Sequence, residues 1–132
     1  MLKITNKDKI ICIILKDNDW EEGLRFITPE SLFLQVGTWW YKKGKKLDAH
    51  KHKDYDRIVN RTMESIYVKK GAIKINLFDE DNYFLESLTI YEGDTAVFAY
   101  GGHGYEILSE NTKILEFKNG PFIDVSKDKE KF

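Results

Sequence analysis

Residues 44–71 read GKKLDAHKHKDYDRIVNRTMESIYVKKG and hold two of the chain's three histidines, His50 and His52, together with Glu64. In an extended segment, side chains two positions apart share a face, so the two histidines are expected to point the same way. Glu64 opens a short run over 64–68 in which alternate positions are aliphatic, which predicts a strand. Because the aliphatic face of such a strand is the buried one, Glu64 is expected to point inward.

The third histidine, His103, lies in a second glycine-rich stretch, YEGDTAVFAYGGHGYE, over 91–106. Imidazole nitrogens suit zinc, iron and nickel, and a carboxylate extends the range towards manganese. We therefore interpret His50, His52, Glu64 and His103 as the ligands of one divalent transition metal (Fe, Zn, Ni or Mn). Such a ligand set leaves positions on the ion open to substrate or water.

Outside these stretches, short runs of β-branched, aliphatic and aromatic residues alternate with turn residues, and no segment has the periodicity of a helix. Residues 72–78 alternate strictly between apolar and polar side chains, which is typical of a half-buried strand. Residues 10–15 are apolar on both faces, which predicts a strand covered on both sides. Residues 3–9 are charged and predict a loose or edge segment. The other predicted strands are 25–28, 32–41 with an interruption at Gly37, 83–90, 95–100, 105–108 and 113–118. This rhythm predicts an all-β sandwich or barrel.

The chain has 132 residues, a net charge of -1 and one cysteine. This length suits a single domain over 1–132, whose core we expect at about 32–118. The near-neutral charge argues against a nucleic-acid partner. The longest aliphatic run is too short to span a membrane, so we expect a cytoplasmic protein without membrane contact. Cys12 lies in the apolar run and is expected to be a buried strand residue.

The two histidine stretches resemble the sequence motifs of the cupin superfamily of small jelly-roll β-barrels. The first cupin motif is G-(x)5-H-x-H-(x)3–4-E-(x)6-G, and the matching residues are Gly44, His50, His52, Glu64 and Gly71. The second is G-(x)5-P-x-G-(x)2-H-(x)3-N, which Gly93, Gly101 and His103 resemble. The resemblance covers about 32–118 and implies a jelly-roll barrel with His50, His52, Glu64 and His103 as metal ligands. It is closest to small bacterial cupins, mostly of unassigned function, some of them associated with cell-surface polysaccharide genes.

The chain departs from the cupin motifs in several places. Eleven residues, 53–63, separate His52 from Glu64, and Asp56 stands at the usual spacing, so Asp56 is a rival ligand. The distance to Gly71 and the strand parity favour Glu64. In the second motif, Ala99 replaces the proline, Ile107 replaces the asparagine, and the gap before His103 is one residue short.

Four further residues are candidates for binding a substrate. Arg57 and Arg61 lie in the long insertion, and arginine binds carboxylate or phosphate with two parallel hydrogen bonds. Alternatively, they form ion pairs with the neighbouring aspartates in a solvated loop. Tyr105 and Glu106 follow His103, and a carboxylate in an apolar barrel is a candidate base. A surface position for Glu106 is the alternative.

Residues 39–41, WWY, place aromatic side chains on both faces of their segment. We expect a core or interface role for them rather than stacking on a substrate. Together with the apolar 10–15 strand, they suggest a homodimer, since an uncovered sheet edge is a liability.

Two classes of function fit this reading. One is a metal-dependent enzyme that acts on a small anionic or sugar-derived molecule, with an arginine as anion clamp. The other is a non-catalytic metal- or metabolite-binding module, because fold alone does not set function. A metal-independent epimerase or isomerase, with a histidine as base, is a further possibility.

Overall fold

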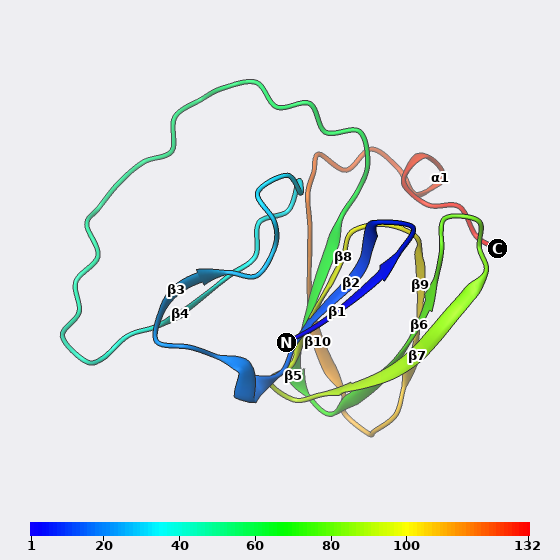
Figure 1. Cartoon of the computed structure of the whole chain (residues 1–132), viewed down its shortest axis with the longest axis horizontal. Helices are drawn as coiled ribbons and strands as arrows, with labels where there is room; N and C mark the ends of the chain where they lie inside the picture. The colour runs from blue at the N-terminus through cyan, green and yellow to red at the C-terminus, as the bar shows by residue number, and fades with distance from the viewer.

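The computed structural model describes residues 1–132 and contains ten β-strands, one 3-10 turn and one short helix (Figure 1). The strands are β1 (Leu2–Asn6), β2 (Lys9–Leu15), β3 (Gly23–Phe26), β4 (Gly37–Trp40), β5 (Glu64–Lys70), β6 (Ala72–Phe78), β7 (Phe84–Tyr91), β8 (Thr95–Phe98), β9 (Gly102–Ile107) and β10 (Lys113–Lys118). The 3-10 turn η1 is Asp17–Asp19 and the helix α1 is Val125–Asp128. All strand pairs are antiparallel, and the all-β prediction is confirmed.

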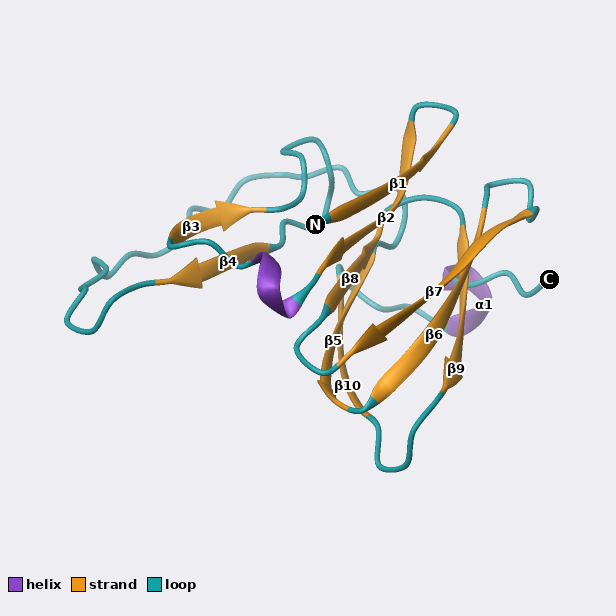
Figure 2. Cartoon of the chain, turned by 60° about the horizontal axis from the view of Figure 1, so that its bottom comes forward, coloured by secondary structure: helices purple, strands orange, loops and turns teal.

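Two sheets face each other and enclose the core (Figure 2). The larger sheet has the order β1-β2-β8-β5-β10 and the smaller has the order β7-β6-β9. The hairpin of β3 and β4 forms a third sheet that stands apart from these two in both views. The strands therefore form three separate antiparallel sheets, and the pairings do not close them into one barrel.

The strand predicted at 72–78 has the predicted bounds and packs as its alternation requires. Ile73, Ile75 and Leu77 are fully buried between the sheets, whereas the side chains between them are half-buried. On β5, Ile66 and Val68 join the same core, and Glu64 is buried on the same strand at 5% exposure. The inward direction predicted for Glu64 is confirmed.

Strand β2 is buried on both faces, as predicted, and Cys12 is buried within it. One face joins the core between the sheets, and the other joins a second apolar cluster that includes Ile27, Leu32 and Met63. The second cover thus comes from the same chain. Strand β2 is not an uncovered apolar face awaiting a partner, and the core begins well before the expected range 32–118.

The long strand predicted over 32–41 is wrong for its first half. Only Gly37–Trp40 form a strand, because residues 29–36 fold into a compact loop instead. The Gln35 amide donates to the carbonyls of Pro29 and Leu32, and the Val36 amide donates to the Thr28 hydroxyl. The apolar side chains of this loop, Leu32, Phe33, Leu34 and Val36, cover the outer face of the larger sheet.

Of the two alternatives predicted for residues 3–9, a loose or an edge segment, the structure shows the edge segment. Residues Leu2–Asn6 pair with β2 as the edge strand β1, and Ile4 is buried in the core. The charged side chains mark the exposed face of an edge strand, which natural sheets protect with charge. No helix of the chain is long and apolar enough to cross a membrane.

Candidate functional site

Glu64 is the centre of a polar cluster at one end of the sandwich. It opens β5, where it lies opposite Phe98 of β8 on one side and Lys118 of β10 on the other. Across the core, His103 and Tyr105 occupy alternate positions of β9 and so share the face that turns towards Glu64. The register between the strands, more than any local sequence, brings the side chains of Glu64, Lys118, His103 and Tyr105 together.

The Glu64 carboxylate accepts three polar contacts. The Tyr105 hydroxyl donates to Oε1 at 2.6 Å, His103 Nε2 lies 3.4 Å from the same oxygen, and Lys118 Nζ lies 3.2 Å from Oε2. Burial acts to raise the pKa of Glu64, but the contacts with His103, Tyr105 and Lys118 outweigh it and lower that pKa to about 2. Glu64 is therefore ionised at neutral pH, as a buried carboxylate with matched donors should be.

The contacts of the three partners of Glu64 define their protonation states or their positions. Burial and the neighbouring carboxylate raise the pKa of Tyr105, so its hydroxyl keeps the proton that it donates. A hydrogen bond to Glu116, with the charge of Glu64 added, raises the pKa of Lys118. The imidazole of His103 stacks on the ring of Phe98, with 4.2 Å between the ring centres.

Glu64, His103 and Lys118 of this cluster line a cavity of about 1070 Å³. Its lining comes from residues 57–64, 79–82, 98–103 and 118–132, so the C-terminal segment with α1 borders it. Small-molecule sites in proteins occupy about 300–1,000 Å³. The cavity is large enough for a metabolite of sugar-phosphate size.

Arg57 and Arg61 also line the cavity. The Arg61 guanidinium lies over the Tyr100 ring, 3.2 Å from its centre, and its Nε is buried without a hydrogen-bond partner in the protein. The Arg57 guanidinium lies over the Tyr55 ring at 3.8 Å. Neither arginine takes part in an ion pair, and so neither is neutralised by the aspartates at 54 and 56.

The carboxylates that line the cavity are in contrast already engaged. Asp79 accepts from two backbone amides, Asp124 caps α1, Asp128 accepts from the Thr62 hydroxyl, and Glu80 pairs with Lys9. Only Glu130 has no such partner among the acidic lining residues. These hydrogen bonds satisfy the carboxylate oxygens without removing their charge, so the feature that distinguishes Arg61 is its Nε, a buried donor that no acceptor in the protein satisfies.

The structure brings together only part of the predicted ligand set. Glu64 and His103 are in contact, whereas His50 and His52 lie on the exposed segment 42–60, which makes a wide arc away from the sheets (Figure 1). Their rings lie edge to face, 5.3 Å apart between centres, and Asp56 is exposed on the same segment. No group of three or more histidine, cysteine or acidic side chains is gathered as a metal site.

The other predicted residues divide between cavity and surface. Tyr105 belongs to the Glu64 cluster. Glu106 points from the opposite face of β9 and pairs with Lys74 at 2.7 Å, in a surface position. Trp39 and Trp40 are exposed at 60% and 53%, and neither is a core residue.

Two residues of the site were not predicted from the sequence. Lys118 ends β10, and Asn119 ties the loop before β5 to that strand: its Oδ1 accepts from the Met63 amide at 2.6 Å and its Nδ2 donates to the Arg61 carbonyl at 3.1 Å. Asn119 thereby sets the position of Arg61. An asparagine at the end of a predicted strand is only a weak signal, because the same residue also marks ordinary turns.

Comparisons of this chain with models of known protein families, with curated proteins and with solved structures found no significant match.

Proposed function

We propose that this chain is a cupin-type jelly-roll protein that binds a small anionic, sugar-derived molecule in the cavity beside Glu64, and acts on it as an enzyme. The observation that carries the proposal is the Arg61 Nε, a buried donor without a partner beside the cavity. Arg57 and Arg61 both line the cavity and are free of ion pairs. A phosphate or carboxylate would satisfy that donor with a charge-assisted hydrogen bond.

Each residue of the site has a role in this proposal. Arg61, held over Tyr100 and fixed through Asn119, binds the anionic group, and Arg57 adds a second positive charge to the lining. Glu64 holds His103 and Tyr105 in position from one side of the core. His103 is then the polar group at the cavity wall that meets the rest of the ligand.

Loss of Arg61 is expected to weaken anion binding roughly tenfold or more, because a hydrogen bond to a charged group contributes about 1.5–3 kcal/mol. Isothermal titration with glucose 1-phosphate, glucuronate and inorganic phosphate would measure the affinity of the wild type and of Arg61→Gln. Arg25→Gln is the matched control, since Arg25 pairs with Glu21 outside the cavity. Equal affinities of the two variants, or no binding of any probe by the wild type, would contradict the proposal.

NMR of the same mixtures of protein and probe distinguishes an enzyme from a binding module. A bound probe that is recovered chemically changed, as followed by NMR of the mixture over time, supports catalysis. A probe that binds through Arg61 and is recovered unchanged supports the non-catalytic alternative for that compound.

Metal binding is the second candidate function, and the contact between Glu64 and His103 favours it. Their Oε1 and Nε2 atoms are 3.4 Å apart, close enough for both to bind one ion at about 2.1 Å each. The fit is partial, because His50 and His52 lie on the exposed segment. When bound, a divalent transition metal would act as a Lewis acid on substrate oxygens.

Elemental mass spectrometry of protein purified without a histidine tag tests the metal site. We expect near-stoichiometric metal in the wild type and in Asp56→Ala, and at least a tenfold loss of affinity in Glu64→Gln and in the His50→Ala/His52→Ala double variant. Retention of metal in the double variant would reduce the site to Glu64 and His103. Metal absent from all samples, even after reconstitution, would refute the metal site and leave the anion site standing.

A further inference from the structure

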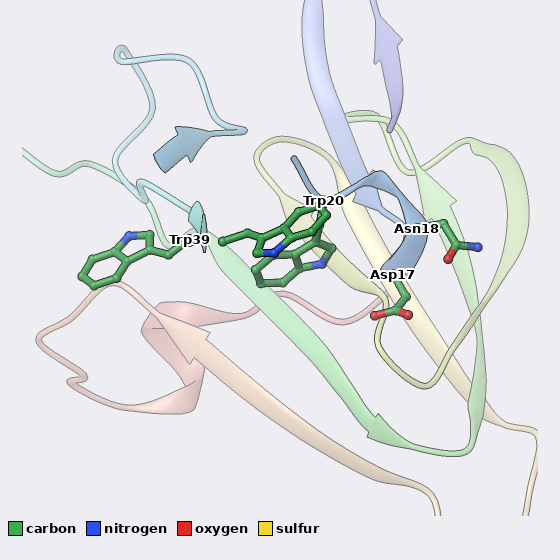
Figure 3. Close-up of a pocket in the computed structure, with 5 residues that line it drawn as sticks. Asp17, Asn18, Trp20 and Trp39 are labelled. Carbon is green, nitrogen blue, oxygen red and sulfur yellow. The ribbon is translucent and has the colours of Figure 1, made fainter. Parts of the chain in front are cut away.

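All three tryptophans of the chain gather around one pocket on the outside of the molecule, far from the Glu64 cluster in sequence and sharing no residue with the inner cavity. The pocket measures about 440 Å³ and is lined by Asp17, Asn18, Trp20, Trp39 and Trp40 (Figure 3). Trp20 follows the 3-10 turn η1, and the other two indoles come from β4. Two segments that are distant along the chain thus line one pocket with tryptophans, although Trp39 and Trp40, as neighbours on a strand, turn to opposite faces of β4.

The indoles are left uncovered by the protein itself. Trp20, Trp39 and Trp40 are exposed at 36%, 60% and 53%, and none belongs to the stacked or edge-to-face ring pairs of the structure. Opposite Trp40 in the hairpin stands Gly23, whose missing side chain leaves open space. Large apolar faces held open to water on one side of a protein mark a surface that something else covers.

Polar groups line the same pocket on a rigid support. The Asp17 amide donates to Oδ1 of buried Asp94 at 3.0 Å, and Lys16 Nζ binds Oδ2 of Asp94 at 2.8 Å, so η1 is anchored to the turn before β8. The side chains of Asp17 and Asn18 are exposed and make no hydrogen bond of their own. A carboxylate and an amide are therefore free to bind a ligand beside the indoles.

The arrangement fits a sugar better than a cation. In Figure 3, the ring of Trp39 points away from Trp20, and Asp17 and Asn18 lie on the other side of Trp20, so the rings do not surround a common centre as they would in a closed cage. An ammonium ion is best held by rings that surround it and has no use for the amide donors of Asn18. Sugar hydroxyls both donate and accept, and a pyranose ring presents a flat apolar face to an indole. The uncompensated charge of Asp17 disfavours an anionic sugar.

We propose that this outer pocket binds a neutral oligosaccharide, with sugar rings stacked on the indoles and hydroxyls bound by Asp17 and Asn18. The site is separate from the inner cavity, takes an uncharged ligand where the inner cavity takes an anion, and stands whether or not the anion proposal holds. Because more than one tryptophan lines the pocket, a chain of sugars is expected to bind more tightly than a monosaccharide.

Intrinsic fluorescence is a direct assay, because every tryptophan of the chain lines this pocket. We expect at least one of cellotetraose, chitotetraose and maltotetraose to shift the emission of the wild type saturably at millimolar concentration. Calorimetry with that sugar should show a loss of roughly tenfold in Trp40→Ala and in Trp20→Phe, and of roughly fivefold in Asp17→Ala. Arg61→Gln, which changes only the inner cavity, should keep the wild-type affinity.

Three results would overturn the proposal. The first is no saturable response to any of the three sugars. The second is a response to choline chloride that equals or exceeds the response to the sugars, which would assign the pocket to a cation. The third is an emission shift that follows protein concentration, with a dimer in light scattering, which would assign the indoles to a contact between two copies of this chain. Because Trp20→Phe retains an aromatic ring, this variant is expected to fold, and it keeps the comparison with the wild type possible if Trp40→Ala does not fold.

Discussion

Gly101→Ala is expected to lower the free energy of unfolding by about 3 kcal/mol or more, the largest effect among the glycines of this chain. Gly101 has φ +68°, and a Cβ at this position would lie 2.2 Å from the carbonyl oxygen of Phe78. The left-handed backbone costs a non-glycine residue about 1–2 kcal/mol, and the clash adds the cost of moving a neighbouring strand. Phe78 ends β6, whose pairing with β9 would have to shift.

Gly44→Ala is the matched control. Gly44 also has a positive φ, +92°, but a Cβ there would meet nothing within 4 Å. Its substitution is therefore expected to cost about 1 kcal/mol or less. Urea denaturation of both variants measures the difference, and equal losses would contradict the close approach of Gly101 to β6.

The Gly101 substitution also tests the site. Gly101 directly precedes β9, which carries His103 and Tyr105. A forced shift of this strand should move both residues relative to Glu64. We therefore expect any anion or metal affinity of the inner cavity to fall in Gly101→Ala and to remain in Gly44→Ala.

Glu64→Ala is expected to destabilise the protein by about 2 kcal/mol, the second largest effect. The substitution leaves the Tyr105 hydroxyl and the Lys118 ammonium without their shared acceptor, and opens space at a position that is 5% exposed. The expected loss stays below that of a fully buried ion pair, because Lys118 is partly exposed and keeps its contact with Glu116 at 2.8 Å.

Two comparisons show whether the Glu64 cluster causes this loss. Glu106→Ala removes a carboxylate of an exposed pair with Lys74 and should cost about 0.5 kcal/mol. In a double-mutant cycle, Glu64→Ala and Tyr105→Phe should couple by about 1 kcal/mol, since both remove the same hydrogen bond. Additive effects of the two substitutions, or a loss in Glu106→Ala as large as in Glu64→Ala, would show that the cluster does not stabilise the fold.

Alternation of apolar and polar residues predicted some strands of this chain correctly and one incorrectly. The alternation over 72–78 marked β6 to the residue, and the parity of β5 placed Glu64 inside, because alternating burial follows directly from the pleat of a strand. The same rule predicted a strand over 32–36, and this prediction is wrong. The apolar residues of this segment cover the outer face of a sheet from a loop, and composition alone does not distinguish a covering loop from a strand.

The sequence by itself determined the strand character of this protein, the burial of both faces of β2 and the inward side chain at position 64. Only the tertiary structure decided that Lys118 and Tyr105 would meet that carboxylate, that residues 42–60 would leave the sheets, and that all three tryptophans would line one outer pocket. The physical reason is the range of each interaction. Side-chain periodicity reports how one strand is buried, whereas the neighbours of a side chain depend on the register between strands tens of residues apart, which the packing of the whole core selects.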